Sequence, residues 1–412
     1  MQVVYARCCG LDIHKKTVVA CVVITHPDGT VQRRVRTFAT MTADLLALSD
    51  WLTSWGVTHV AMESTGVYWQ PVFNILEDET RTLLLVNAQH IKTVPGRKTD
   101  VRDSEWLAEL LRHGLLRASF IPPAPIRALR ELTRYRKTLV QERTAEANRL
   151  QKVLEAATLK RAAVASDVLG ASGRDMLAAL LDGERDPEVL AELARGKLRA
   201  QLPALRRALA GRVKPHHLVL IERILAHIDF LEQSIAQLQE QIDRSLAPFE
   251  DDVVLLDGIT GVGRTAAAAM VAEIGVDMSR FPSSDHLASW AGVCPGNKQS
   301  GGKHLSAKTT KGNPWLRAVL AEGAQAIARS PGTYLHAQYQ RLARRRGKPK
   351  ALMAVAHSVL VIAYHILKDK RPYTDLGADY FDQLDTARIQ RHHVQRLEHL
   401  GFTVTLTPKE AA

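Results

Sequence analysis

The sequence predicts an α/β domain at the N-terminus followed by a longer all-α region. Over roughly the first 120 residues, extended apolar runs alternate with amphipathic helical patterns, which is typical of a mixed sheet with helices packed on it. From residue 126 onward, helical periodicity dominates. The chain has 412 residues, of which 46% are hydrophobic, so it can bury a large core and is expected to form two or three domains.

The first domain begins with three consecutive extended runs. The stretch GLDIHKK is followed by TVVACVVI, a turn HPDGT and a third run VQRRVRTFAT. Asp28 lies in the turn, where an aspartate needs no functional explanation. Further strands are expected at residues 59–64 and 82–88, and amphipathic helices at residues 42–55, 67–79 and 100–116. The order of these elements predicts a mixed sheet.

Two long helices are predicted after this domain. The first covers residues 126–161 and is highly charged, whereas residues 162–215 are less regular and carry no motif that we can place. The second has apolar residues at alternating spacings of three and four, namely Ile221, Ile224, Ile228, Leu231, Ile235, Leu238 and Ile242. This a/d pattern over three heptads predicts a coiled coil. A helix packed within its own domain is the alternative interpretation, because the pattern is short.

Changes of pattern divide the chain into four regions. An α/β domain is expected at residues 1–125 and a helical, coiled-coil region at residues 126–250. A compact helical domain should follow at residues 251–345, and a basic helical tail at residues 346–412.

The cysteines and the hydropathy pattern indicate the compartment. Cys8, Cys9, Cys21 and Cys294 show neither C-x-x-C nor metal-site spacing, which favours a reducing compartment over a disulfide framework. We find no signal peptide and no long uncharged apolar run. A soluble cytoplasmic protein with no membrane partner is therefore expected.

Positive charge is concentrated in the C-terminal half. The chain has 55 Lys and Arg against 43 Asp and Glu, which gives a net charge of +12. Between residues 286 and 368 there is one acid, Glu322, and the basic residues are Lys298, Lys303, Lys308, Lys311, Arg317, Arg329, Arg341, Arg344, Arg345, Arg346, Lys348, Lys350 and Lys368. Since a solvated surface normally mixes both signs, this segment indicates contact with nucleic-acid phosphates.

The glycine-rich stretch DGITGVGRT allows two interpretations. Residues 258–265 approach a phosphate-binding G-x-x-x-x-G-K-[ST] loop, but Arg264 replaces the lysine and no strand ending in Asp follows. In a helix-hairpin-helix, the turn from Gly261 to Gly263 would bring backbone N–H groups to a DNA phosphate at the start of the next helix. We favour the second interpretation, which implies binding to the DNA backbone rather than to a base sequence.

Four acids occupy unusual positions in the predicted α/β domain. Asp12 lies inside the first extended run, and Glu63 lies at the end of another. Asp100 and Asp103 are three residues apart at the start of a helix, so they project from one face. Carboxylates from neighbouring elements repel one another unless divalent cations lie between them, and such oxygen ligands suit Mg²⁺ or Mn²⁺. Two such ions can assist the attacking and leaving oxygens of phosphodiester chemistry.

Each acid also has an ordinary structural explanation. Asp100 and Asp103 are favourable in the first turn of a helix, and Glu63 could cap the helix that follows it. Asp12 could bond to the backbone. The joint order of strand Asp, strand Glu and helix Asp-x-x-Asp nevertheless favours a metal site over four independent coincidences.

Several stretches resemble the DEDD insertion-sequence transposases of the IS110 family. The N-terminal RuvC-like domain of that family is similar to GLDIHKKTVVACVV, AMESTGVYWQPVFNILE and VNAQHIKTVPGRKTDVRDSEWLAELLRHGLL. Its second transposase domain is similar to LLDGITGVGRTAAAAMVAEIG and RFPSSDHLASWAGVCPGNKQSGGKHLSAKTTKGNPWLRAVLAEGA. The resemblance covers most of residues 5–330 and is weaker over residues 331–412.

The resemblance implies a site and a fold. Residues 1–125 would be an RNase H-like, RuvC-like domain, whose metal-binding DEDD set is Asp12, Glu63, Asp100 and Asp103. Residues 251–345 would be the second transposase domain, with Ser300 in NKQSGGK as the nucleophile of a serine–DNA intermediate.

The resemblance also implies an activity and partners. Members of the family excise their element as a circle and insert it elsewhere, guided by a bridge RNA. The site is then shared between the RuvC-like domain of one subunit and the serine domain of another, in a homodimer or homotetramer. The protein would act in a prokaryotic cytoplasm, at the nucleoid when active.

The residues by themselves say less about the serine. A serine before two glycines is usually a loop residue, although Gly301 and Gly302 would allow a phosphate to approach closely. Lys298, Lys303 and His304 could stabilise charge on phosphate oxygens, and Ser306 is the next candidate nucleophile. The residues expected to bind nucleic acid are Gly261, Gly263, Arg264, Lys298, Lys303, Lys308, Lys311, Arg317, Arg344, Arg345 and Arg346.

Two other classes of protein stay open. A Holliday-junction resolvase would use the same four acids with a metal-activated water and would need no serine. A non-enzymatic helix-hairpin-helix protein would bind DNA and need neither set.

Overall fold

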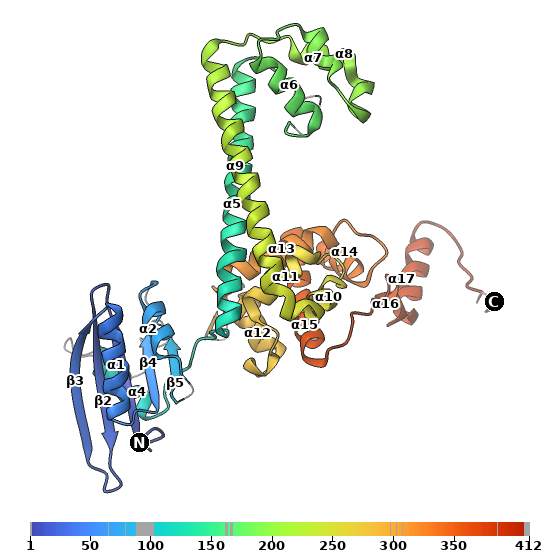
Figure 1. The fold of residues 1–412 in the computed structure, drawn as a ribbon. Coiled ribbons are helices and arrows are strands. Elements are labelled where there is room, and N and C mark those ends of the chain that lie inside the picture. The colour runs from blue at the N-terminus through green and yellow to red at the C-terminus, as the bar shows by residue number, and fades with distance from the viewer. Residues whose placement is uncertain are drawn as a thin grey trace. The chain divides into compact units, whose positions relative to one another are not determined.

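The computed structural model describes residues 2–64, 66–78, 80–87, 103–160, 164, 168–296, 298–301, 303–306, 308–384 and 386–407. The chain divides into two compact units, Met1–Ile121 and Pro122–Ala412. The first is a mixed α/β unit, and helices dominate the second (Figure 1).

The first unit is built on a five-stranded sheet with the order β3-β2-β1-β4-β5. Its strands are β1 (Arg7–Ile13), β2 (Thr17–Thr25), β3 (Val31–Ala39), β4 (His59–Glu63) and β5 (Thr82–Val86). The first three form an antiparallel meander, whereas β4 pairs parallel to β1 and β5 pairs parallel to β4. The predicted mixed sheet is confirmed, and this arrangement is consistent with an RNase H-like fold.

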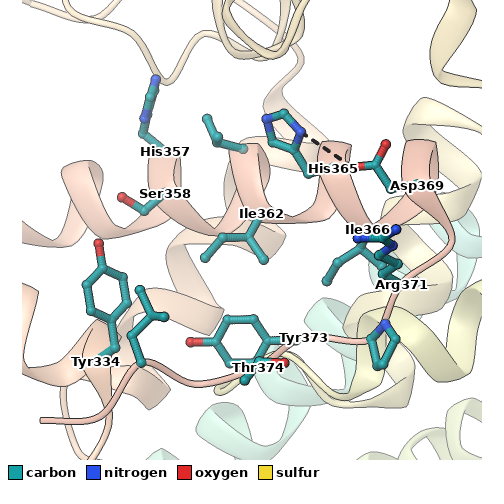
Figure 2. Close-up of a pocket in the computed structure, with 13 residues that line it drawn as sticks. Tyr334, His357, Ser358, Ile362, His365, Ile366, Asp369, Arg371, Tyr373 and Thr374 are labelled. Atoms are coloured by element: carbon teal, nitrogen blue, oxygen red, sulfur yellow. Dashed lines mark ion pairs between the residues drawn. The ribbon is translucent and has the colours of Figure 1, made fainter. Parts of the chain in front are cut away.

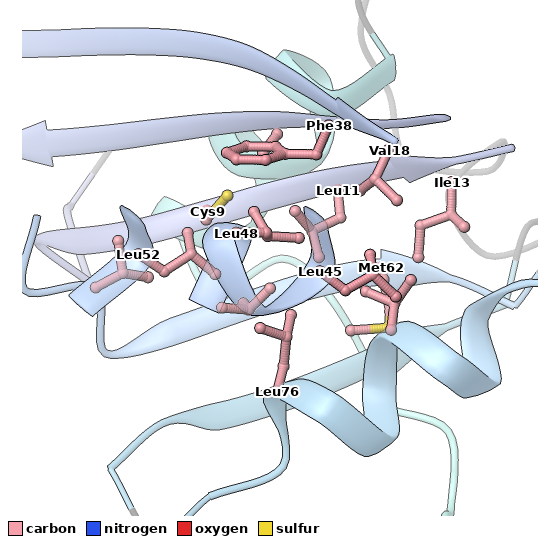
Figure 3. Packing of buried hydrophobic residues seen from close by; sticks show 14 of the residues in the cluster. Cys9, Leu11, Ile13, Val18, Phe38, Leu45, Leu48, Leu52, Met62 and Leu76 are labelled. Carbon is pink, nitrogen blue, oxygen red and sulfur yellow. The ribbon is translucent and has the colours of Figure 1, made fainter. Parts of the chain in front are cut away.

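Helices cover both faces of this sheet. The face with α1 (Thr42–Ser54) and α2 (Trp69–Leu76) holds the larger core, in which Leu11, Leu48 and Met62 are fully buried (Figure 3). The opposite face packs on α4 (Asp103–Arg112) through Cys8, Ala61 and their neighbours. Because alternate residues of β1, β2 and β4 are buried on opposite faces, these strands are apolar almost throughout.

In the second unit, α5 (Ala124–Ala156) and α9 (Pro215–Leu246) run antiparallel, side by side (Figure 1). Residues of the predicted seam, among them Ile221, Ile228 and Ile242, are buried. The helix that packs on this seam of α9 is thus α5 of the same chain. Ile224, Ile235 and Leu238 of the same seam are half-buried.

A small helical cluster forms one end of the α5–α9 pair. It contains α6 (Ala171–Leu181), α7 (Pro187–Glu192), η2 (Gly196–Gln201) and α8 (Leu202–Leu209). Leu177, Leu190 and Leu205 of this cluster share a core with Leu150 and Leu154 of α5. The stretch without a recognisable motif therefore has a packed structure around residues 168–209.

The other end of the pair carries a larger helical assembly. Its elements are η3 (Ala247–Phe249), α10 (Glu250–Asp257), α11 (Arg264–Ile274), η4 (Met278–Arg280), α12 (Ser284–Ala291), β6 (Lys298–Ser300), β7 (Lys303–Ser306), α13 (Pro314–Ile327), α14 (Tyr334–Arg346) and α15 (Lys348–Asp369). Two short helices follow, α16 (Tyr380–Gln383) and α17 (Thr386–His399).

Helix α15 corrects one expectation from the sequence. It is 22 residues long and apolar enough, by length and composition, to cross a membrane, so a long apolar run does exist. In the fold it lies against α10, α12, α13 and α14, and Val355, Val359 and Ala363 are fully buried. The run was overlooked because Lys348, Lys350 and Lys368 flank it; its apolarity is explained by its place at the centre of the helical assembly.

Candidate active site

Asp12 and Glu63 lie at the same edge of the sheet. In the parallel β1–β4 pair, Leu11 is opposite Met62, which places the next residue of each strand, Asp12 and Glu63, side by side in register. The side chains of Leu11 and Met62 both point to the face of the sheet that carries α1. Successive side chains of a strand point to opposite faces, so Asp12 and Glu63 point the other way. Both carboxylates therefore project from the face that α4 covers.

Asp103 reaches the same neighbourhood because α4 lies unusually close to β1. A Cβ atom at Gly10 would be 2.2 Å from the carbonyl oxygen of Ser104 and 2.5 Å from the amide nitrogen of Ala108. Only glycine permits this approach. Gly10 is two residues from Asp12 on the same face, and Ser104 follows Asp103, the first residue of α4. The structure thus brings Asp12, Glu63 and Asp103 to one end of the sheet.

The three acids have surroundings suited to binding a ligand. Asp12 is 28% exposed in its side chain, and Glu63 and Asp103 are also half-buried. His14 lies with its Nε2 3.2 Å from Oδ2 of Asp12, a contact that the sequence analysis missed. The signal was present in the D-x-H spacing, since residues two apart on a strand share a face.

Carboxylate oxygens are the kind of donor that a hard divalent cation prefers, and the backbone brings three residues that carry them to one end of the sheet. Within the described ranges, no three His, Cys, Asp or Glu side chains are close enough to form a ready metal cage. Asp100, the fourth predicted ligand, lies outside the described residues.

Glu109 fixes α4 to the sheet edge. Its carboxylate accepts hydrogen bonds from Arg33 of β3 at 2.9 Å and from Arg112 at 2.7 Å, and it lies 3.1 Å from Nε2 of His113. Burial opposes ionisation of Glu109, but Arg33 and Arg112 outweigh it and lower the pKa of this carboxyl. The first turn of α4, which begins with Asp103, is held in place by this contact and by packing on Gly10.

Ser300 lies in a short hairpin of the second unit. It is the last residue of β6 and pairs with Lys303, the first residue of β7. Gly301 between them has a φ of +55°, a left-handed conformation that favours glycine. The backbone thus places Ser300 beside the turn. The side chains of Lys298, Ser300, Lys303, His304 and Ser306 lie outside what the structure describes, as does Gly302.

The base of this hairpin is closed by backbone contacts. A Cβ atom at Gly292 would be 2.7 Å from the amide nitrogen of Gly312, so the two chain segments touch through glycines. The amide of Gly296 donates to the carbonyl of Lys308 at 2.9 Å. The segment that carries Ser300 therefore leaves the helical assembly at Gly292 and returns to it at Gly312.

A buried charge network lies next to Gly312, because the following residue, Asn313, is part of it. Glu273, at the end of α11, is 2% exposed. Its carboxylate accepts hydrogen bonds from Nε and Nη2 of Arg134 in α5, at 2.7 and 2.8 Å. Arg130 donates to the backbone carbonyls of Ala272 and Glu273 at 3.1 and 2.6 Å. The Nδ2 of Asn313 donates to Glu273 at 2.5 Å, while its Oδ1 accepts from the amides that begin α13.

This network was missed by the sequence analysis. The available signal was an acid inside the apolar helix RTAAAAMVAEI, the same kind of signal that singled out Asp12. Burial lowers the pKa of Arg130 to about 10, and the carboxylate of Glu273 counteracts part of that effect. Glu273 therefore connects α5, α11 and the N-terminus of α13 around one buried carboxylate.

The glycine turn before α11 joins two helices. Helix α10 precedes it, so the strand that a phosphate-binding loop requires is absent from residues 250–257. Gly261 has a φ of +81°, and a Cβ atom there would be 2.8 Å from the carbonyl of Gly323 in α13. Gly263 is open, with nothing near its Cβ position. Of the two glycines predicted to contact DNA, Gly261 packs against α13, whereas no atom lies within 4 Å of the Cβ position of Gly263.

The N-terminus of α11 opens onto a cavity of about 680 Å³. Its walls come from α5, α9, α11 and α13, and they include Arg136, Lys137, Asp243 and Thr265. Arg264 also lines it, but its guanidinium is paired with both carboxylate oxygens of Glu250, at 2.5 and 2.9 Å. The expected role of Arg264 at a phosphate thus competes with an intramolecular ion pair.

The other predicted nucleic-acid ligands lie on exposed or half-exposed surface. Arg344, Arg345 and Arg346 form the exposed last turn of α14. Lys308 and Lys311 are exposed between the hairpin and α13, and Arg317 is half-buried in α13.

A second cavity, of about 490 Å³, separates α15 from the segment 371–376 (Figure 2). Ile362 and Ile366 of α15 face Tyr334 and Tyr373 across it (Figure 2). Its walls are mainly apolar, and His365 lies at its rim with Asp369, 4.0 Å away. Nothing in this cavity resembles a catalytic constellation.

Comparison with known proteins gives the family. A sequence profile of the DEDD domain of IS110, described as transposase, matches residues 9–158. A second profile, described as transposase of the IS116/IS110/IS902 family, matches residues 254–340. The first range contains the four acids and the second contains Ser300.

Curated relatives agree with the profiles. The chain is 26% identical over 328 residues to the insertion element IS116 uncharacterized 44.8 kDa protein of Streptomyces clavuligerus, which covers 71% of this chain and 80% of that protein. It is 31% identical over 155 residues to the mini-circle putative transposase for IS117 of Streptomyces coelicolor, covering 37% and 35%. It is also 31% identical over 150 residues to the pilin gene-inverting protein of Moraxella bovis, covering 34% and 45%.

These matches exclude a purely structural DNA-binding protein. The first profile covers the α/β unit and continues through α5, and the second profile lies within the helical unit. The chain belongs to the IS110 family of transposases and is an enzyme that acts on DNA.

Proposed function

We propose that this transposase excises and inserts an insertion sequence by cutting and rejoining DNA strands through a serine–DNA intermediate, guided by an RNA. The convergence of Asp12, Glu63 and Asp103 on one face of the sheet carries the proposal. Relatives named as a mini-circle transposase and as a pilin gene-inverting protein support it, because circle formation and inversion both require rejoining after cleavage.

In this proposal the acids hold Mg²⁺ or Mn²⁺. Asp12 and Glu63 would bind from the strand ends, and Asp103, together with Asp100, from the start of α4. Bound there, the cation would supply Lewis-acid stabilisation of charge on the phosphate oxygens. His14 would hold the carboxylate of Asp12 in orientation from a distance of 3.2 Å.

Ser300 would supply the covalent step. Its Oγ attacks a backbone phosphorus, its proton passes to a base, and the bond from phosphorus to one sugar oxygen breaks, with that oxygen leaving as a hydroxyl after it takes up a proton. The reverse reaction with another sugar hydroxyl reseals the DNA and frees the serine. The position of Ser300 beside a glycine turn supports this role, since a glycine without a side chain lets a phosphate come close to the backbone.

The acids and the serine belong to separate compact units. We propose that the complete site is assembled between subunits of a dimer or tetramer. Strand exchange joins two DNA duplexes, so at least two cleavage sites must act together. Basic surface in the second unit, including Arg344, Arg345 and Arg346, would bind the DNA and the guide RNA through their phosphates.

The decisive experiment compares three variants with the wild-type protein on supercoiled DNA that carries the element. Asp12→Asn should lose strand cleavage and keep its fold. Ser300→Ala should bind DNA and form no covalent protein–DNA adduct. Asp28→Asn is the matched control for the first variant, because Asp28 is an exposed turn aspartate bonded to Thr30, and it should remain active.

Four outcomes would contradict parts of the proposal. Wild-type cleavage by Asp12→Asn would remove the acids from the site. A covalent adduct from Ser300→Ala would move the nucleophile to another residue, with Ser306 next. Cleavage without any adduct in the wild-type protein would favour the resolvase mechanism, in which water attacks. Activity restored by mixing Asp12→Asn with Ser300→Ala would support a site shared between chains, and its absence would argue for a site within one chain.

A further inference from the structure

The outer edge of the sheet in the first unit is strongly basic. Strand β3 pairs on one side with β2 and forms the edge of the sheet on the other. Its nine residues contain Arg33, Arg34 and Arg36 and no acid. All three arginines are exposed. The exposed surface of this edge strand is therefore basic, without acids to balance it within the strand.

Two of these arginines carry uncompensated charge. Arg33 is paired with Glu109 at 2.9 Å, as described above. Arg34 and Arg36 form no ion pair with any acid among the described residues. They lie instead near aromatic rings, Arg34 at 6.0 Å from the ring centre of Trp55 and Arg36 at 4.7 Å from that of Phe38. A ring below a guanidinium orders it and does not occupy its N–H donors. One of these donors, Nη1 of Arg34, contacts the carbonyl oxygen of Arg33 at 3.5 Å.

The basic edge continues around the end of the sheet. Lys15 and Lys16 lie in the turn between β1 and β2, where both are exposed. The hydroxyl of Thr40 donates to the carbonyl of Lys15 at 3.0 Å, which ties this turn to the end of β3. Residues 14–16 and 31–39 contain five Lys or Arg and no acid. We call Lys15, Lys16, Arg34 and Arg36 the edge strip.

We propose that the edge strip binds the phosphate backbone of the DNA duplex that flanks the cleavage position. Spaced cations along an extended strand suit a chain of phosphates, and they would bind without reading bases. Arg34 and Arg36 alternate with Thr37, which is in register with Val19 and Asp12, so they project from the face opposite the acids. Arg34 and Arg36 of the strip therefore lie outside the proposed catalytic centre, on the other face of the sheet.

The competing explanation is protection of the edge. Charged residues on an edge strand prevent it from pairing with another sheet, and arginines can serve only that purpose. The two explanations differ in one measurable property. Bound phosphates release counterions from the DNA, so the affinity of a DNA-binding surface depends on salt, whereas edge protection affects only self-association.

The experiment measures binding of full-length protein to random-sequence duplex DNA over a range of salt concentrations, without divalent cations. The double variant Arg34→Gln/Arg36→Gln should reduce the slope of log Kd against log salt by about 2 and weaken binding roughly tenfold at moderate salt. Arg34→Lys/Arg36→Lys should retain most of the affinity. Because cleavage is not read out, the result is independent of the roles proposed for Ser300 and the acids.

The matched control removes two arginines elsewhere. Arg195 and Arg199 are exposed and paired with Asp175 and Glu192, so Arg195→Gln/Arg199→Gln loses the same charge from a compensated surface. An equal loss of affinity in this control, or an unchanged slope in the edge variant, overturns the proposal. So does self-association of the edge variant with normal DNA binding, which would establish edge protection. The affinity for single-stranded RNA is measured in parallel. If the edge variant loses affinity only for that RNA, the strip binds RNA, and the proposal that it binds duplex DNA is refuted.

Discussion

Glu273→Gln should destabilise the helical unit by about 3–5 kcal/mol, the usual effect of removing one partner from a buried ion pair. The Glu273 side chain is only 3% exposed, and both of its oxygens accept from Arg134. Glutamine has nearly the same shape, but one of its terminal atoms is a donor. That donor would face an N–H group of Arg134 or of Asn313, so at least one short hydrogen bond becomes a repulsive contact.

The size of the effect follows from the two arginines left behind. Arg130 is 16% exposed and has a pKa lowered to about 10 by burial, so it already bears a desolvation cost that Glu273 offsets. Arg134 is 33% exposed and can regain some water. We therefore expect a value near the lower end, about 3 kcal/mol, which is still a large part of the 5–15 kcal/mol by which a typical domain is stable.

Hydrogen exchange read by mass spectrometry measures this change where it should occur. Backbone amides of α11 and of α13 should exchange faster by roughly two orders of magnitude if about 3 kcal/mol is lost from the opening that exposes them. The first unit should be unaffected, since it is a separate compact unit. Urea unfolding of the whole chain complements the measurement, although its transition combines the two units.

Glu250→Gln is the matched control. It removes the same carboxylate from a bidentate pair with an arginine, but Glu250 and Arg264 are 42% and 49% exposed. Solvent screening should make its effect on stability much smaller than that of Glu273→Gln. If Glu273→Gln costs no more than Glu250→Gln, burial does not set the energy of the network, and the reasoning is refuted.

Three further results are expected. Gly10→Ala should cost about 2–3 kcal/mol by forcing α4 away from β1, and it should abolish cleavage with all four acids intact; thermal unfolding and cleavage assays check this. Changing Arg344, Arg345 and Arg346 to Glu should weaken binding to any nucleic acid and reduce the salt slope by about 3, and an unchanged slope would make that surface idle. Glu109 has a lowered pKa, so its stabilisation is present above the unfolded-state value near 4.3 and is lost as the pH falls through the folded-state value. Glu109→Gln should thus be less stable at neutral pH and less sensitive to acid, as melting curves across pH would show.

Much of the first unit could be predicted from local patterns. The strand GLDI was correctly placed because alternate residues must face two different cores, which makes the strand apolar throughout and leaves the acid conspicuous. The convergence of Asp12 with Glu63 also follows from pattern, because parallel neighbouring strands end at the same edge. The close approach of α4 could have been anticipated from a glycine in mid-strand, since Gly10 has no other conformational need.

The second unit was less predictable because its main contacts join distant segments. The seam on α9 shows that this helix needs an apolar partner, but the same seam would suit another chain as well as α5. Spacing within one helix carries no information about the identity of the helix opposite. For the same reason, the basic residues on β3 were visible in the sequence, whereas their position at a free edge depends on the strand order of the whole sheet.

Asp12 and Glu273 give the same signal in sequence, a single acid in an apolar element, and the structure assigns them different surroundings. Asp12 is near the end of its strand and 28% exposed, and Nε2 of His14 lies against its carboxylate. Glu273 is 3% exposed, and Arg130 and Arg134, one turn apart on α5, meet it from the facing helix. An acid with buried cations at helical spacing opposite it has its charge compensated within the protein. An acid at the open end of a sheet, next to other acids, can have its charge balanced by a bound cation, so we infer a metal-binding role for Asp12 and a structural role for Glu273.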